Sequence, residues 1–360
     1  MKKIKIDNLH FDTSEIEGYQ KTYNFVVSPR EAGKTTALLR KAYKIFRDKQ
    51  QTTLIIRRRI ADITESYIND LGTVISLFYD DIHLSYNKGS IRSGIIDVYT
   101  INNKVKSNVP IFRIIALSNP MSRTKGGALP SLGLILFDEF ICNTRCNEKY
   151  LEGEAFIFRE VYTTYRRWNE NVKVWFLGNP YSLYSPYTSW LKVPTSKLKP
   201  GVILTGPDWV FQAYQIKEEL KEHILKTNPL YQFDDTYTRY AFSGESINDS
   251  NIIIISTQPR GYNLKYVFKI EQQYVAYYYG TSQDVNVPSW WCSIIDWKPE
   301  YKRTAWCFDF DNLSAGSEIM NKNSKSILIS LSMSIQQRNI AFKDIEASYL
   351  TEEVYPFIGG

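Results

Sequence analysis

A segment near the amino end carries residues that could bind phosphate groups. It reads Ser28-Pro29-Arg30-Glu31-Ala32-Gly33-Lys34-Thr35 and stands between an apolar run and a helical pattern. This matches the P-loop pattern G-x-x-x-x-G-K-[ST], with Ser28 in place of the first glycine. Gly33 would let the backbone approach the phosphates, Lys34 would contact the β- and γ-phosphates, and the Thr35 hydroxyl would ligate Mg²⁺. The predicted nucleotide-binding residues are Ser28, Arg30, Gly33, Lys34, Thr35 and Thr36.

A second feature is a pair of acids at the end of an apolar run. The run Leu134-Ile135-Leu136-Phe137 leads into Asp138 and Glu139, which is the Walker-B arrangement. Asp138 would hold hydrated Mg²⁺, and Glu139 would orient or deprotonate the attacking water. Alone, the two acids could be a solvated strand end. Together with a P-loop upstream, they predict an enzyme that hydrolyses a nucleoside triphosphate.

Two further polar positions lie near the same elements. Asn179 follows the apolar run 172–177, so its amide could sense the γ-phosphate and couple hydrolysis to movement; the alternative is a turn-forming Asn-Pro. Arg166 and Arg167 end the helical pattern before that run. An arginine there could complete the active site of a neighbouring subunit, or it could be a solvated helix end.

The elements that must position these residues follow an alternating pattern. Short buried runs alternate with amphipathic stretches, which predicts an α/β domain with a mostly parallel sheet covered on both faces. Strands are expected over 23–27, 53–57, 111–117, 134–137 and 172–177, helices over 34–48, 60–79 and 152–168, and a hairpin excursion over 82–101.

The pattern changes in the second half of the chain. Residues 178–210 are rich in Gly, Pro, Ser and Tyr and predict a loop, and 211–225 predicts a short polar helix. Strands are then expected over 251–256, 264–270, 273–279, 290–295, 304–310 and 327–335, with a final helix over 341–353. We therefore expect a nucleotide-hydrolysing domain over 1–200, a linker over 201–228 and a smaller second domain over 229–360.

Charge separates the two halves. Residues 1–200 contain 30 Lys and Arg against 19 Asp and Glu, a net +11, and residues 201–360 contain 14 against 19, a net −5. The basic half is expected to meet a polyanion such as nucleotide phosphate or a nucleic-acid backbone. No apolar run is long enough to span a membrane, and the first residues lack the pattern of a secretory signal. The four cysteines show no CxxC pair, so we expect an intracellular protein with reduced thiols and no zinc site.

Taken in order, these segments resemble the DNA-packaging motor ATPases of small phi29-like tailed phages. The resemblance covers most of the chain and is carried by Asn24-Phe25-Val26-Val27, Ile55-Ile56-Arg57-Arg58, Leu136-Phe137-Asp138-Glu139-Phe140-Ile141, Tyr165-Arg166 and Leu177-Gly178-Asn179. It implies an additional-strand catalytic-Glu (ASCE) ATPase domain, a linker and an RNase H-like carboxy-terminal domain without nuclease chemistry. Ser28 departs from the family's glycine.

The resemblance also implies functions for individual residues and partners. Lys34 and Thr35 would bind ATP and Mg²⁺ with Asp138, Glu139 would be catalytic, and Arg166 and Lys125 would act on the adjacent subunit's site. Arg30 matches an arginine of the family's P-loop segment. The implied activity is ATP-driven translocation of double-stranded DNA into a procapsid by a ring, pentameric in this family, on the portal. A packaging RNA is a further candidate partner, and the implied location is the host cytoplasm and, transiently, the portal vertex.

DNA contacts and the second domain leave alternatives open. Lys88, Arg92, Lys104 and Lys106 are candidates for the DNA channel, or solvated loop charges. Asp296, Asp309 and Asp311 cluster near strand ends, so metal binding is not excluded. The rival functions are a terminase with a live carboxy-terminal nuclease, another P-loop translocase or helicase, and a non-catalytic nucleotide-binding subunit.

Overall fold

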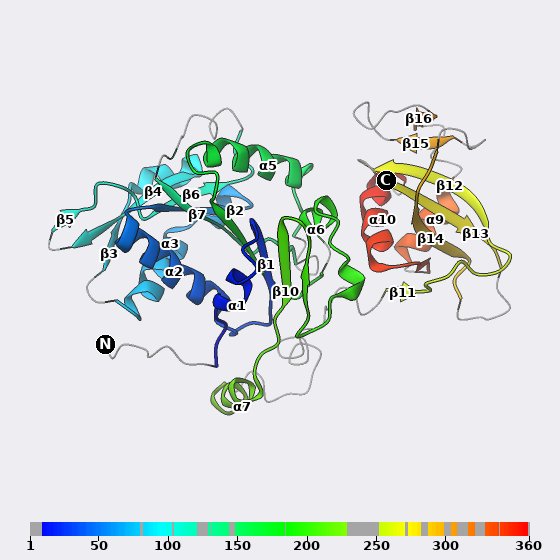
Figure 1. Cartoon of the computed structure of the whole chain (residues 1–360). Helices are drawn as coiled ribbons and strands as arrows, with labels where there is room; N and C mark the ends of the chain where they lie inside the picture. The colour runs from blue at the N-terminus through cyan, green and yellow to red at the C-terminus, as the bar shows by residue number, and fades with distance from the viewer. Residues whose placement is uncertain are drawn as a thin grey trace. The chain divides into compact units, whose positions relative to one another are not determined.

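The chain forms two units, Met1–Ile247 and Asn248–Gly360 (Figure 1). The structure is a computed structural model. It describes residues 9–79, 82–102, 104–120, 129, 131–143, 148–183, 185–228, 252–270, 273–281, 287–298, 304–307, 316–320, 328–337 and 339–358.

A ten-stranded sheet organises the first unit, in the order β3-β4-β6-β2-β7-β8-β1-β10-β9, with β5 paired to β4. The strands from β6 to β10 in this order run parallel, whereas β4 and β9 pair antiparallel with their neighbours. The strands are β1 Tyr23–Val27, β2 Thr52–Arg57, β3 His83–Ser85, β4 Ile95–Asn102, β5 Val105–Lys106, β6 Phe112–Ala116, β7 Leu132–Asp138, β8 Lys173–Gly178, β9 Ile203–Thr205 and β10 Trp209–Ala213. Because β8 separates the P-loop strand β1 from the acid strand β7, the sheet has the additional-strand arrangement that the family resemblance implied.

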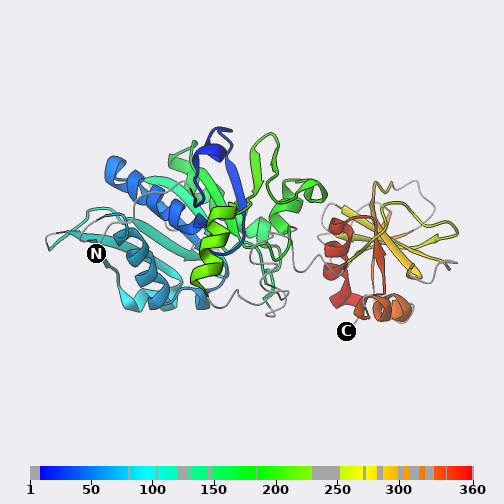
Figure 2. The same ribbon diagram turned by 90° about the horizontal axis from the view of Figure 1, so that it is seen from below.

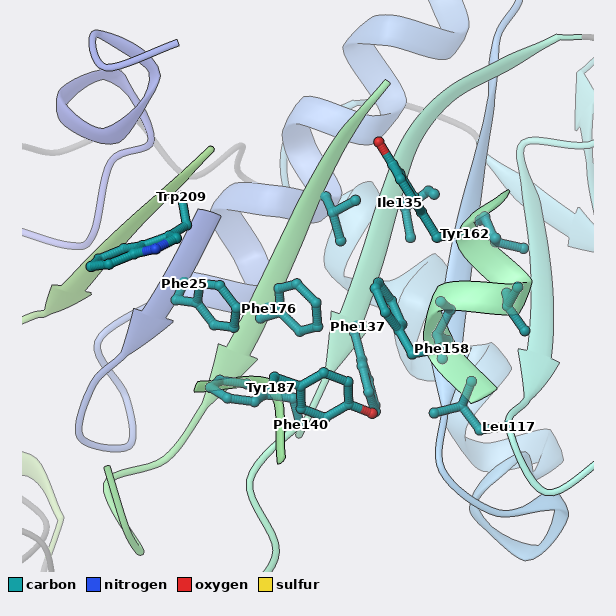
Figure 3. Packing of buried hydrophobic residues seen from close by; sticks show 14 of the residues in the cluster. Phe25, Leu117, Ile135, Phe137, Phe140, Phe158, Tyr162, Phe176, Tyr187 and Trp209 are labelled. Carbon is teal, nitrogen blue, oxygen red and sulfur yellow. The ribbon is translucent and has the colours of Figure 1, made fainter. Parts of the chain in front are cut away.

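Helices cover both faces of this sheet. They are α1 Ser14–Glu17, α2 Lys34–Lys49, α3 Glu65–Ser76, α5 Glu154–Tyr165, α6 Pro186–Trp190 and α7 Glu218–Thr227, with short 3₁₀ turns η1 Ile60–Asp62, η2 Lys88–Ser93, η4 Arg166–Trp168 and η5 Thr195–Lys197. Alternate residues of each strand point to opposite faces of the sheet. Phe25 therefore lies in the core on the face covered by α5 and α6, whereas Val26 lies in the core on the face covered by α2 and α3. Figure 3 shows Phe158 of α5 against Phe137 and Phe176 of the sheet.

The boundary expected at residue 200 is wrong. Residues 201–228 are not a linker, because β9 and β10 extend the main sheet and β10 pairs in parallel with β1. The helix expected over 211–225 is replaced by the end of β10 and by α7. All five residues of β10 are buried, and Phe211 stacks on Phe25 with ring centroids 5.5 Å apart. Strand pairing to β1 and burial therefore outweigh the local helical pattern.

Smaller differences have local causes. The helix expected over 60–79 begins at Glu65, because Thr64 caps it by accepting a hydrogen bond from the Tyr67 amide, at 3.1 Å. The excursion over 82–101 consists of β3 and β4 with η2 between them, and β4 joins the main sheet through β6. The strand expected over 327–335 is the helix α9, although its apolar residues alternate as in a strand.

A seven-stranded sheet forms the second unit, in the order β11-β17-β14-β13-β12-β15-β16. Its strands are β11 Ile253–Ile254, β12 Asn263–Ile270, β13 Gln273–Tyr279, β14 Trp290–Ile295, β15 Ala305–Cys307, β16 Ser317–Ile319 and β17 Ala341–Phe342, and its helices are α9 Ile329–Gln336 and α10 Ile345–Ile358. Strands β12, β13 and β14 form an antiparallel meander, and the outer strands add in parallel. Figure 2 shows α9 and α10 beside this sheet. Its likeness to RNase H stays a prediction.

Within the part of the chain that the structure describes, no helix combines the length and the apolar character needed to cross a bilayer.

Cutting the chain at residue 200 should unfold the first unit. A fragment 1–200 loses β10, whose Trp209, Val210 and Phe211 are at most 6% exposed. Burying such side chains contributes about 1.5–3 kcal/mol each, against a total stability of about 5–15 kcal/mol for a domain. We expect fragment 1–200 to be aggregated or unfolded by circular dichroism, and fragment 1–247 to melt cooperatively. A cooperative transition in fragment 1–200 would show that β10 is dispensable.

Candidate active site

Four neighbouring parallel strands bring the predicted site residues to one edge of the sheet. In the order β2-β7-β8-β1, each strand pairs with the next, and Val27 lies opposite Gly178 while Asp138 lies opposite Leu177. Because neighbouring strands are about 4.8 Å apart, the residues that follow them converge. The P-loop, both acids and Asn179 therefore share one edge, as the sequence predicted.

The P-loop holds a left-handed glycine at the start of α2. Gly33 is the N-cap residue, with φ 84°, and a Cβ built there would lie 3.1 Å from the Cβ of His10. Ser28 is buried and is not among the residues with positive φ. Its amide donates to the Gly178 carbonyl at 3.2 Å, and its hydroxyl to the Pro29 carbonyl at 3.0 Å. Serine can replace glycine here because this position needs no left-handed backbone.

The Lys34 side chain is buried among acceptors. Its Nζ donates to Asn179 Oδ1 at 2.8 Å and lies 3.5 Å from the Ser28 carbonyl. Burial lowers the pKa of Lys34 to about 8, and the charges of Asp138 and Glu139 oppose that shift. A desolvated ammonium that is bound by one amide oxygen and one carbonyl is well suited to exchange the amide oxygen for phosphate oxygens.

Thr35 and Asp138 place two hard oxygen donors side by side. The Thr35 hydroxyl donates to Asp138 Oδ1 at 3.3 Å. The Asp138 side chain is only 12% exposed, and burial raises its pKa, while the Arg57 guanidinium opposes that shift. Hydroxyl and carboxylate oxygens are ligands that Mg²⁺ accepts. A cation between them would also relieve the buried carboxylate, so these residues fit a magnesium ion.

Arg57 contacts both acids, a feature that the sequence did not assign. Its NH2 donates to Glu139 Oε2 at 2.7 Å, and its NH1 lies 3.9 Å from Asp138 Oδ2. The guanidinium stacks over the ring of Tyr67 with its carbon 4.7 Å from the centroid. Glu139 itself is left-handed, with φ 60°, and its side chain is 59% exposed. The Glu139 carboxylate is therefore at the rim of the site and is bound to the Arg57 guanidinium.

Arg58, the next residue, was also unassigned, and it is buried beneath the acids. It forms an ion pair with Glu154 at 2.9 Å and donates to the backbone carbonyls of Glu139 and Phe140. Two arginines directly after an apolar strand were the only sequence signal for this arrangement, because nothing in the sequence pairs Arg58 with a partner 96 positions away.

The remaining predicted residues have varied surroundings. Arg30 is exposed and donates to the Tyr181 hydroxyl at 3.0 Å, and Thr36 is half-buried in the first turn of α2. Lys125 lies outside the described residues, as do Asp309 and Asp311. Within the described ranges no group of three or more His, Cys, Asp and Glu side chains is placed to hold a metal, and this includes the surroundings of Asp296.

Arg166 is not part of its own chain's site. It is the exposed C-cap residue of α5, and its guanidinium lies over the Tyr162 ring, 5.3 Å from the centroid. Asn169 connects the same turn to the start of β7. Its backbone amide donates to the Arg166 carbonyl, and its side-chain amide donates to the Leu132 carbonyl. Arg166 is thus at the amino edge of the sheet, opposite the P-loop.

The candidate DNA-binding residues lie in two places, with Lys88 and Arg92 in η2 before β4 and Lys104 and Lys106 in the β4–β5 hairpin after it. Lys88 forms an exposed ion pair with Glu65 at 2.6 Å. Arg92 and Lys104 are exposed, and the Lys106 ammonium lies 3.7 Å from the centroid of the Tyr99 ring. Lys104 and Lys106 belong to the β4–β5 hairpin at one end of the sheet (Figure 1).

Two comparisons match this sequence to known proteins. The family model described as podovirus DNA encapsidation protein (Gp16) matches residues 6–286. The DNA packaging protein of Bacillus phage B103 is 25% identical over 260 residues, which are 70% of this chain and 72% of that protein.

Two solved structures share the fold. A chain of the bacteriophage Phi-29 viral genome packaging motor assembly matches with a TM-score of 0.66 and 17% identity, over 98% of this chain and 100% of that one. The Phi-28 gp11 DNA packaging motor matches with a TM-score of 0.63 and 16% identity, over 98% of both chains.

Two glycines separate backbone strain from nucleotide contact. Gly33 and Gly153 are both left-handed N-cap residues, but a Cβ at Gly153 would meet nothing within 4 Å. We expect Gly153→Ala to lower the free energy of unfolding by about 1–2 kcal/mol and to leave ATP affinity unchanged. Gly33→Ala should lower stability further and weaken ATP binding by on the order of tenfold or more, measured by calorimetry. Equal ATP affinities for the two variants would contradict the P-loop assignment.

Proposed function

The chain belongs to the podovirus DNA encapsidation protein (Gp16) family, and we propose that its first unit hydrolyses ATP to translocate double-stranded DNA into a procapsid. The observation that supports hydrolysis most strongly is the convergence of Lys34, Asp138 and Glu139 on one sheet edge. The basic balance of residues 1–200 supports a polyanionic substrate for the translocation step.

Each residue at the edge has a distinct function in this proposal. Lys34 releases Asn179 and binds the β- and γ-phosphates, and the free amides at the start of α2 bind the same anion. Magnesium held by Thr35 and Asp138 would neutralise the phosphate charge. Glu139 orients the attacking water and accepts its proton. Asn179, released from Lys34 in this exchange, is the proposed coupling residue.

Arg57 sets the starting position of Glu139. Glu139 Oε2 already accepts a hydrogen bond from Arg57, so this oxygen is occupied. Glu139 must therefore loosen its contact with Arg57 before it accepts a proton from water. Without nucleotide, the same contact offsets the repulsion between the two adjacent acids.

Arg166 requires a second copy of the chain. The helix α5 that ends at Arg166 has 12 residues and spans about 18 Å at 1.5 Å per residue, which separates Arg166 from its own P-loop. In a ring, the amino edge of one subunit can meet the carboxyl edge of the next. We propose that Arg166 stabilises the transition state in the neighbouring subunit, and that the ring is the pentamer implied by the family.

DNA contact is assigned to the basic end of the sheet. Lys104 and Lys106 on the β4–β5 hairpin are proposed to contact phosphates without regard to sequence, and Arg92, which lies in η2 before the other end of β4, is a separate candidate. Lys88 is a weaker candidate, because Glu65 already neutralises it. The second unit is proposed to be an RNase H-like domain without nuclease activity that binds the portal or a packaging RNA. Mg²⁺- or Mn²⁺-dependent cutting of plasmid DNA would instead indicate a terminase nuclease.

Two substitutions test the division between binding and hydrolysis. Glu139→Gln keeps the size of the side chain but removes the base, so kcat should fall by about 10²–10⁴-fold while binding of ATP with Mg²⁺ persists. Lys34→Ala removes the phosphate contact, so binding itself should be lost. Steady-state phosphate release and calorimetry measure the two effects, with duplex DNA and procapsids present and absent. Normal turnover by Glu139→Gln would refute the catalytic assignment.

Mixing of variants tests the contribution of Arg166 in trans. Arg166→Ala should bind ATP normally but lose hydrolysis in the assembled ring, whereas Arg47→Ala, an exposed arginine in the last turn of α2, should behave as wild type. Rings mixed from Arg166→Ala and Glu139→Gln subunits should recover part of the activity, because some interfaces then pair intact groups. Full activity of dilute, monomeric Arg166→Ala would exclude the trans assignment.

A further inference from the structure

A buried ion pair lies directly under the catalytic glutamate. Arg58 Nε donates to both carboxylate oxygens of Glu154, at 3.1 and 2.9 Å. The Arg58 side chain is 8% exposed and that of Glu154 is fully buried. The other side of the same guanidinium donates to the backbone, from NH1 to the Glu139 carbonyl at 3.2 Å and from NH2 to the Phe140 carbonyl at 2.6 Å.

Glu154 is itself held by three elements. It is the first residue of α5, and its carboxylate also accepts from the Leu151 amide at 2.7 Å and from the Tyr187 hydroxyl at 2.8 Å. Tyr187 lies beside Phe140 in the core between the sheet and α5 (Figure 3). The pair therefore connects the end of β2, the turn after β7, the start of α5 and the helix α6.

Stability alone is a weak reason for this pair. Removing two charges from water costs as much as their attraction returns, and apolar residues often replace such pairs without loss. What apolar residues cannot do is bind the carbonyls of Glu139 and Phe140. These belong to a turn in which Glu139 has φ 60°, a conformation that a residue with a side chain rarely adopts.

We propose that Arg58 and Glu154 are positioning residues that fix the left-handed backbone of Glu139 and so place its carboxylate for water activation. Neither residue touches the substrate. The guanidinium bonds to the carbonyl of Glu139 and of its neighbour, and Glu154 fixes the guanidinium in turn. This inference rests on the proposed hydrolysis, in which Glu139 acts on water. It adds that the Arg58–Glu154 pair holds Glu139 in place.

A double substitution distinguishes positioning from plain stabilisation. Arg58→Met with Glu154→Met removes both charges and keeps the core filled, but it leaves four buried or partly buried polar groups without these partners: the Glu139 and Phe140 carbonyls, the Leu151 amide and the Tyr187 hydroxyl. The variant should therefore fold but melt below wild type. Affinity for a non-hydrolysable ATP analogue should stay within about twofold, whereas kcat should fall by on the order of 10²-fold, the effect of a misplaced catalytic group. The matched control is Arg113→Met with Asp97→Leu, which removes a bidentate pair at 2.7 and 2.8 Å between β6 and β4, away from the acids.

Cys142 supplies a second readout that does not depend on hydrolysis. Its thiol is buried in the turn that follows Glu139, and its amide donates to the Tyr150 hydroxyl. Burial raises the pKa of Cys142 to about 12, so iodoacetamide should label it slowly at pH 8. Peptide mass spectrometry should show faster labelling of Cys142 in the Arg58/Glu154 variant and unchanged labelling in the control.

The kcat and the rate of Cys142 labelling together distinguish failure of the positioning inference from failure of the proposed function. If wild type does not hydrolyse ATP, the proposed function fails, and Cys142 labelling still shows whether the pair fixes the turn. A folded double variant with wild-type kcat, or with Cys142 as protected as in wild type, overturns the positioning inference. If the double variant does not fold, Arg58→Lys replaces it. That variant keeps the charge but cannot reach both carbonyls and Glu154, so the same loss of kcat and faster labelling are expected.

Discussion

The site depends on one constraint of the parallel sheet, which is that β2, β7, β8 and β1 must end at the same edge. Their pairing brings Lys34, Asp138, Glu139 and Asn179 together from segments far apart in the chain. A shift of any of these strands by one residue would turn its side chains to the other face and separate the hydroxyl of Thr35 from the carboxylate of Asp138. The aromatic core between the sheet and α5 fixes this alignment (Figure 3).

Charge at this edge is balanced by residues on the neighbouring strand. The two acids follow β7, and Arg57 and Arg58 lie at the end of β2 beside it. Arg57 faces the rim and contacts the carboxylates, whereas Arg58 faces the interior and contacts the backbone and Glu154. Arg57 thus contacts the Glu139 carboxylate, and Arg58 contacts the Glu139 backbone.

Much of the first unit could be predicted from the sequence, and the failures have physical causes. The P-loop, both acids and Asn179 were predicted because each follows a strand with a clear apolar run. Strand β10 was missed, because its pairing to β1 is not encoded in its own periodicity, and α9 was missed because its apolar residues alternate as in a strand. The Arg58–Glu154 pair could not be found, since it joins residues 96 positions apart.

The most direct test of the account is a crystal structure with a non-hydrolysable ATP analogue and Mg²⁺. The account predicts that Lys34 leaves Asn179 to contact the β- and γ-phosphates, that Thr35 and Asp138 approach the cation, and that Glu139 faces the γ-phosphate through a water. A ligand bound elsewhere, with the contacts between Lys34 and Asn179 and between Arg57 and Glu139 unchanged, would contradict it.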